Sequence, residues 1–437
     1  MLGIAITASP LAVCSAGVMG VIVALAGRGL ESRERKLVQT LLCVAIAARL
    51  AMIAGLFVYS LYSGQPVTSF WFDGDGVFMK RRSLWIRSFW SGVPLDPSLF
   101  RLTYDRYGWS SYVQVIAYLQ YLLGEAPFAV HFFNISCYLA AAALLHRTVR
   151  HAYGAAASLV ALVVTLFMPT LFCWSLSALK ESLYFLLTVG VVSGSVTFLQ
   201  RTGLVWRLGG IGMVTGATVA LGGIRAGAFV FVGGTLGLAL AGTFLTRRLY
   251  LLGVAVLLVW FLGGRLIETP QVQSRLMPLL VESATLHTGH VRTEGHGYKL
   301  LDERLYLPGA LESMTWPEAQ RFLARAVWSF AVAPLPWTIE THSELLFVPQ
   351  QLIWYSLLIL AVPGVVTGIR RDACLTWMLI GLICSAAAVI APNMGNVGTL
   401  VRFRDTVVPF VACLGALGAV SVLKRITPGN FGGAASA

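Results

Sequence analysis

The chain has 437 residues, of which 57% are hydrophobic and 12% are charged, and its mean hydropathy is +0.76. Soluble domains carry about 25% charged residues, so this composition excludes a soluble enzyme, a disordered chain and a disulfide scaffold. The formal net charge of +13 would suggest a nucleic-acid partner in a soluble protein. In a membrane protein the placement of the charges matters more than their sum, so no nucleic acid is expected.

Long apolar runs between short basic segments predict an all-α, polytopic transmembrane helical bundle, because ~20 apolar residues are needed to cross ~30 Å of hydrocarbon. The N-terminal apolar run has no basic region before it, so we interpret it as a membrane helix and not as a signal peptide. Residues 1–423 are predicted to form a single membrane domain, followed by a short cytoplasmic tail over 424–437. About eleven spans are predicted, near residues 3–27, 38–62, 126–146, 154–174, 182–200, 208–224, 227–246, 249–264, 346–369, 373–391 and 406–423.

Basic residues cluster in alternate short loops, and the positive-inside rule makes these loops cytoplasmic. The N-terminus then lies outside, the C-terminus inside, and two long loops, about 63–125 and 265–345, lie outside. Each long loop contains an aromatic-rich stretch that is expected to form a helix in the membrane interface. The residues that define the cytoplasmic side are Arg28, Arg33, Arg35, Lys36, Arg147, Arg150, Arg201, Arg207, Arg247, Arg248, Arg370, Arg371, Lys424 and Arg425.

Acidic residues in the first outer loop are candidates for catalysis. Asp73 and Asp75 are separated by one glycine and follow the second predicted span. Carboxylates placed there can accept a proton from a hydroxyl or bind a divalent cation near a phosphate; the alternative is an ordinary polar turn. Asp105, later in the loop, is a possible second acid, with a salt bridge to neighbouring basic residues as its alternative.

The start of the span predicted near 182–200 carries a second candidate group, Lys180 and Glu181. Helix N-termini favour anions, and lysine together with the nearby serine hydroxyls adds donors for a phosphate. Glu181 is a further possible acid. The alternative is a helix cap with a snorkelling lysine. Arg49 falls within the second predicted span, and an ionisable group at that depth is a functional candidate unless it pairs with a carbonyl or an acid.

Three arginines lie on the predicted outer side, where the positive-inside rule does not require positive charge: Arg225, Arg402 and Arg404. Arginine binds phosphate in a bidentate manner, and a cation at the membrane edge must be paired or must snorkel, so a phosphate-binding role is favoured. The alternative is a structural salt bridge to Glu181 or Asp405.

His287 and His290 in the second outer loop superficially offer metal ligands. The two histidines lack the glutamate-bearing helix of a zinc protease, so we predict no metal site there. They are kept only as weak candidates for metal ligands.

Taken together, these residues resemble the GT-C superfamily of integral-membrane glycosyltransferases. The features that carry the resemblance are Arg49, the acidic motif with Asp73, Asp75 and Phe78, an aromatic helix ending at Leu123 and Gly124, and the glycine-rich helix from Gly216 to Arg225. Such enzymes take a sugar from a polyprenyl-phosphate carrier on the extracytoplasmic side and place the catalytic acid in the first outer loop. The chain departs from the pattern in its extra first helix and in the missing large C-terminal domain.

The resemblance implies that Asp73 or Asp75 is the base and that Lys180 and the outer arginines bind the carrier phosphate. A divalent cation, Mg²⁺ or Mn²⁺, is optional in such a mechanism, and the acceptor could be a glycan, a lipid or a protein. The stretches over residues 177–182 and 398–404 resemble segments of membrane proteins of bacterial surface-polysaccharide synthesis, which implies a location in a bacterial inner membrane.

Two other functions remain open from the sequence. A polysaccharide polymerase or ligase also acts on lipid-linked glycans, and would depend on Arg292, His287 and His290 of the second outer loop. A transporter or lipid flippase would carry repeats and polar groups near the bilayer midplane. The polar candidates instead gather at the outer edge, which favours chemistry at the interface.

Overall fold

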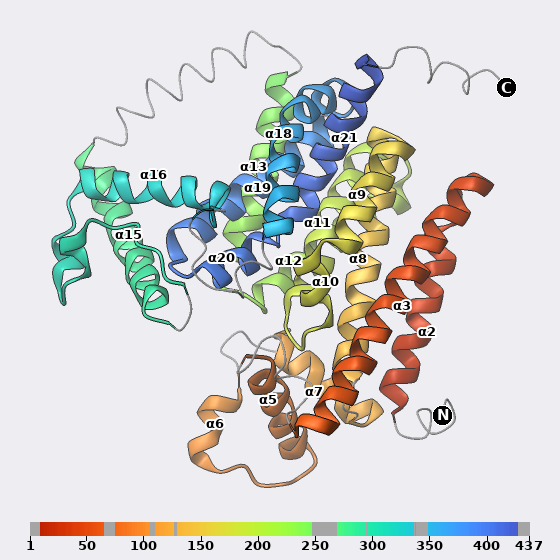
Figure 1. Ribbon diagram of the computed structural model, residues 1–437, viewed down its shortest axis with the longest axis horizontal. Helices are drawn as coiled ribbons and strands as arrows, with labels where there is room; N and C mark the ends of the chain where they lie inside the picture. Colours follow the sequence, from red (N-terminus) through yellow and green to blue (C-terminus); the bar gives the residue numbers. More distant parts are fainter. Residues whose placement is uncertain are drawn as a thin grey trace. The chain divides into compact units, whose positions relative to one another are not determined.

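The computed structural model describes residues 9–64, 75–104, 110–125, 129–246, 269–293, 296–335, 337 and 348–426 (Figure 1). The regular structure in these residues is helical, apart from one isolated antiparallel bridge between Gly297 and Asn396, and turns and extended segments join the helices. Eight helices in the described part are long and apolar enough to cross a membrane, and a bent pair makes a ninth candidate. The prediction of a polytopic helical membrane protein is therefore confirmed.

Most predicted spans correspond to one helix each. The eight candidate spans are α3 (Ser32–Ser63), α8 (Ala129–Tyr153), α11 (Glu181–Gln200), α12 (Leu204–Gly222), α13 (Ala228–Thr246), α18 (Val348–Arg371), α19 with the short η4 (Ala373–Asn393) and α21 (Val408–Ile426).

The other three predicted spans have different outcomes. The first is a helix of 17 residues, α2 (Pro10–Ala26), which begins after Ser9, whose hydroxyl accepts from Ala12 N. The span predicted over 154–174 is two helices, α9 (Ala155–Phe167) and α10 (Pro169–Leu176), bent by 59°. Pro169 explains the break, because its ring and missing N–H end the preceding helix. The span predicted over 249–264 lies outside the described residues.

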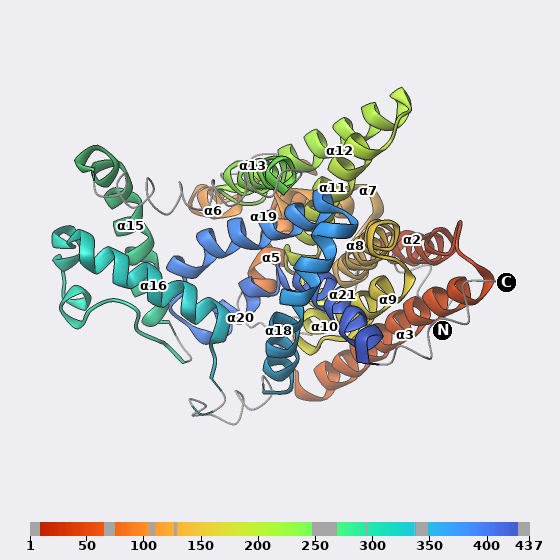
Figure 2. The ribbon, with the colours of Figure 1, turned by 90° about the horizontal axis from the view of Figure 1, so that it is seen from above.

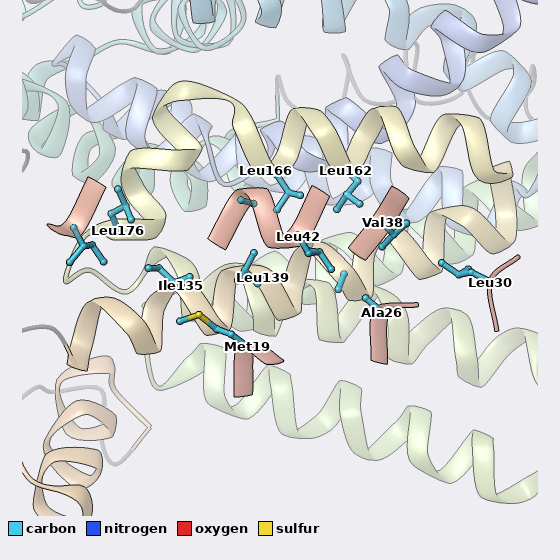
Figure 3. Packing of buried hydrophobic residues seen from close by; sticks show 14 residues of the cluster. Met19, Ala26, Leu30, Val38, Leu42, Ile135, Leu139, Leu162, Leu166 and Leu176 are labelled. Carbon is cyan, nitrogen blue, oxygen red and sulfur yellow. The ribbon is translucent and has the colours of Figure 1, made fainter. Parts of the chain in front are cut away.

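The helices form two compact units, residues 1–232 and 233–437. In the first unit, α2, α3, α8 and α9 enclose an apolar core (Figure 3). Met19 on α2, Leu42 on α3, Leu139 on α8 and Leu166 on α9 all point into it. Helices α11 and α12 pack so closely that a Cβ on Gly194 would lie only 2.9 Å from Gly210 O. Glycine at this position makes the close approach possible.

The second unit contains α18, α19 and α21, with the helices of the second outer loop to one side of them (Figures 1 and 2). A Cβ on Gly364 would clash with the backbone of Leu414, and one on Gly418 with the backbone of Leu360. Glycine at both places lets the backbones of α18 and α21 meet directly.

Both outer loops contain helices, as the aromatic-rich stretches predicted. The first loop holds α5 (Asp75–Trp90), α6 (Pro97–Thr103) and α7 (Tyr112–Leu123). The second holds α15 (Pro270–Val291), the short η1 (Glu303–Tyr306) and η2 (Ala310–Ser313), and α16 (Trp316–Val332). A short helix, α20 (Val397–Arg404), precedes α21.

Candidate functional site

Three of the predicted site residues come together where α11 begins and α12 ends. Arg225 Nη2 lies 3.4 Å from Glu181 Oε1, and its guanidinium carbon lies 4.8 Å from the centre of the Tyr184 ring. Lys180 Nζ donates to the carbonyl of Ile224 at 3.4 Å. Lys180, Glu181 and Arg225 thus form one cluster, although more than 40 residues of chain separate the first two from the third.

The cluster lies at the end of α11 and α12 that is opposite to their basic loop. Arg201 follows the last residue of α11, and Arg207 is in the first turn of α12. The positive-inside rule predicts a cytoplasmic Arg201 end, and it then predicts that the Lys180 end is extracytoplasmic. Lys180 and Arg225 are therefore cations that the topology of the chain does not account for.

The turn that leads into Lys180 is held by side chains from α8. The Nδ1–H of His131 donates to Leu176 O at 2.5 Å, and Asn134 Nδ2 lies 2.5 Å from Ser177 O and 3.0 Å from Leu179 O. Both side chains are buried. These bonds satisfy carbonyls that the non-helical turn leaves without a helical donor.

Sequence reasoning missed His131 and Asn134. With Tyr138 they occupy one face of α8, because helical residues three and four apart are neighbours. Polar side chains repeating at that spacing in an apolar helix are the signal that could have found them.

Asp75 is the first residue of α5 and is exposed. One turn further on, Met79 packs against the cluster formed by Tyr112, Val130 and Ala178. Helix α5 therefore rests on the same turn, Ser177–Lys180, that leads into the cation cluster. Asp73 and Asp105 lie outside the described residues, so their positions are not part of this geometry.

Arg49 is fully buried, as its place in α3 predicts. Its Nε donates to Ser175 Oγ at 2.7 Å, and its Nη2 donates to Leu166 O at 3.0 Å. The guanidinium carbon lies 4.6 Å from the centre of the Phe172 ring. The bond to the Leu166 carbonyl matches the alternative that the sequence left open for this residue, whereas the sequence did not predict a hydroxyl partner.

Arg402 and Arg404 belong to the second unit, on α20. Arg404 is 1% exposed and donates to Ala333 O at 2.5 Å and to Gln351 Oε1 at 2.8 Å. Burial lowers its pKa from 12.5 to about 10, so it stays charged at neutral pH. Arg404 thus joins the end of α16 to α18, whereas Arg402 is half-buried and lies 5.7 Å from the Phe403 ring centre.

His287 and His290 bind the segment that precedes α20. The Nδ1–H of His287 donates to Met394 O at 2.7 Å, and its Nε2 accepts from Leu300 N at 3.3 Å. His290 Nδ1–H donates to Asn393 O at 2.8 Å. Burial lowers the pKa of His287 to about 4, so it is neutral at pH 7 and both of its ring nitrogens are engaged within the protein.

The described residues contain no group of three or more His, Cys, Asp or Glu side chains that could hold a metal ion.

No family model matches this chain, and no curated protein or solved structure matches it. Its function is therefore inferred from the side chains themselves.

Proposed function

We propose that the protein is a membrane glycosyltransferase of GT-C type, which transfers a sugar from a polyprenyl-phosphate-linked donor to an acceptor on the extracytoplasmic face. The observation that carries this proposal is that Lys180 contacts Ile224 O and Arg225 contacts Glu181, so that both cations lie where α11 begins and α12 ends, opposite to the basic loop. A lipid-linked phosphate lies at the membrane surface, where these two cations can meet it.

The chemistry needs a base and a stabilised leaving group. A carboxylate of the first loop, Asp75 or Asp73, takes the proton of the acceptor hydroxyl. At the same time the oxygen of that hydroxyl attacks the anomeric carbon of the sugar. The bond from that carbon to the phosphate oxygen breaks, and its electron pair leaves with the carrier phosphate. Lys180 and Arg225 stabilise the negative charge that develops there.

Other groups at the start of α11 suit a phosphate. The amide groups in the first turn of a helix point along its axis and attract anions. The buried hydroxyl of Ser182 makes no hydrogen bond within the described part of the chain, so it has a donor to offer. Glu181 holds Arg225 in place and prevents an excess of positive charge when no phosphate is bound.

The second unit supplies fewer groups to this proposal. Arg404 is committed to Ala333 and Gln351, so we assign it a structural role, and Arg402 stays a candidate for the phosphate. The acceptor class, whether glycan, lipid or protein, is left open, as is the use of Mg²⁺ or Mn²⁺.

Binding of polyprenyl phosphate tests the proposal. Added at about 100 times its dissociation constant, it should stabilise the purified protein by about 2.7 kcal/mol, measured as a rise in Tm. Lys180→Ala with Arg225→Ala should abolish the rise. Arg321→Ala is the matched control, since Arg321 is half-exposed and pairs with Asp302 of the second loop. If the rise in Tm persists in the double variant, the phosphate does not bind at this cluster.

One observation favours a transporter or lipid flippase instead. The bent pair α9 and α10 is a broken span or a re-entrant loop, and broken spans are common in transporters. Proteoliposomes distinguish the two functions: passage of a labelled lipid across the bilayer, with no Tm response to polyprenyl phosphate, would favour the transporter.

A further inference from the structure

The break between α9 and α10 leaves two carbonyls without their helical donors. Pro169 has no N–H, so Thr165 O loses its bond within the helix, and the bend removes the donor for Leu166 O. Tyr138 Oη donates to Thr165 O at 2.5 Å, and Arg49 Nη2 donates to Leu166 O at 3.0 Å. Side chains of α8 and α3 thus replace both missing donors.

Arg49 also contacts the far side of the break. Its Nε donates to Ser175 Oγ, in the last turn of α10, and Ser175 Oγ donates in turn to Phe172 O at 2.6 Å. A third donor, Nη1, lies 3.2 Å from Ala45 O in its own helix. One guanidinium therefore connects the end of α9, the last turn of α10 and α3.

The segment that Arg49 holds leads directly into Lys180. Helix α10 ends at Leu176, and the turn from Ser177 to Leu179 is buried against His131 and Asn134. Because the chain between Ser175 and Lys180 is short, a change in the direction of α10 would move the start of the turn that carries Lys180.

We propose that Arg49 is a positioning residue: by tying Ser175 to the end of α9, it fixes the turn Ser177–Lys180 and holds Lys180 beside Arg225. The positioning itself is independent of what Lys180 binds. Only its consequence for carrier phosphate rests on the proposed function.

Alkylation of a cysteine in the turn tests the positioning directly. Ala178 is buried, so in a chain whose seven native cysteines are replaced, Ala178→Cys should react slowly with a water-soluble maleimide. Arg49→Met should raise the rate about tenfold or more, as expected when a charged hydrogen bond that closes the segment is lost. An unchanged rate would overturn the proposal.

Two further variants keep this test informative where Arg49→Met does not fold. Ser175→Ala removes the acceptor of Nε and the bond from Ser175 Oγ to Phe172 O. It leaves Arg49 bound to Leu166 O, so it should raise the rate less than Arg49→Met. Arg49→Lys keeps the charge but cannot reach both partners, so it should restore the slow rate in part. Arg150→Met is the matched control, because Arg150 pairs with Glu34 at 2.6 Å and does not hold the turn; an equal rise there would point to general loosening and overturn the proposal.

The functional arm is a double-mutant cycle on polyprenyl phosphate affinity. Arg49→Met and Lys180→Ala should each weaken binding. The double variant should lose less affinity than the product of the two single fold-changes in affinity, because both substitutions act through one ammonium group. A purely structural role of Arg49 predicts multiplicative effects and would overturn the link to Lys180. If the wild-type protein does not bind polyprenyl phosphate at all, the proposed function fails, while the alkylation result still decides the positioning.

Discussion

Each compact unit buries one arginine among its described residues, and the two sites resemble each other closely. Arg49 donates to the carbonyl at the end of α9 and lies over Phe172; Arg404 donates to the carbonyl after α16 and lies 4.9 Å from the centre of the Trp354 ring. The sites differ in the groups to which their partners lead. The chain that follows Ser175, a partner of Arg49, leads to Lys180 and its cluster with Arg225. The partners of Arg404 instead belong to the end of α16 and to α18.

This comparison shows that burial of an arginine does not by itself mark a ligand site. Helix ends release carbonyls, and a guanidinium with five donors is well suited to collect them where no water is available. The candidates for a ligand, Lys180, Arg225 and Arg402, are instead half-buried.

The largest expected effect falls on neither buried arginine. Asp75→Asn combined with Asp73→Asn should lower sugar transfer about 10²-fold or more, the usual contribution of a general base, with unfolding stability unchanged. Release of polyprenyl phosphate from a labelled polyprenyl-phosphate-linked hexose measures it. Asp96→Asn, which alters only the cap of α6 in the same loop, is the control. Wild-type rates in the double variant would rule out the acid assignment.

The comparison itself is tested by removing the arginine of the second unit. Arg404→Met should lower the free energy of unfolding by about 2–4 kcal/mol, because it leaves buried acceptors unpaired. Arg402→Met, two residues earlier and half-buried, should cost less than about 1 kcal/mol. Denaturant unfolding in detergent measures both, and binding of polyprenyl phosphate should survive in Arg404→Met. Loss of that binding in a folded variant would give Arg404 a role at the phosphate.

A smaller effect concerns pH. The pKa of His287 is lowered from 6.5 to about 4, so the unfolded chain binds a proton in this range and the folded chain does not. Stability should therefore be fully present above pH 6.5 and fall as the pH drops toward 4, by roughly 2–3 kcal/mol at most.

His287→Asn is the matching variant, since its amide can still donate to Met394 O. It should remove this part of the pH dependence, measured by unfolding at pH 7 and pH 4.5. An unchanged slope between these pH values would mean that other groups cause the acid sensitivity.

The spans could be predicted because hydropathy is a local property, and α3, α8 and α11 follow from their apolar runs alone. The break at Pro169 could have been predicted but was not, because the apolar run continues through it and proline is tolerated in membrane helices. The salt bridge between Arg225 and Glu181 was one of two alternatives, and the structure contains it.

The partners of Arg49 could not be predicted. Ser175 and Leu166 lie 126 and 117 residues away along the chain, and the choice of partner depends on how α3, α9 and α10 pack. The same holds for Asn134, whose acceptors are the carbonyls of a turn more than 40 residues away. Local patterns name the polar residues, but packing decides what they bind.

The bent pair has a consequence for biogenesis. Helix α9 has 13 residues and covers about 20 Å, which is less than the ~30 Å of hydrocarbon, so it cannot insert as an independent span. Synthesis proceeds from the N-terminus, so α3 carries Arg49 into the bilayer before Leu166 and Ser175 exist. During that interval the guanidinium lacks these two partners, so water or lipid headgroups have to solvate it until α9 and α10 arrive.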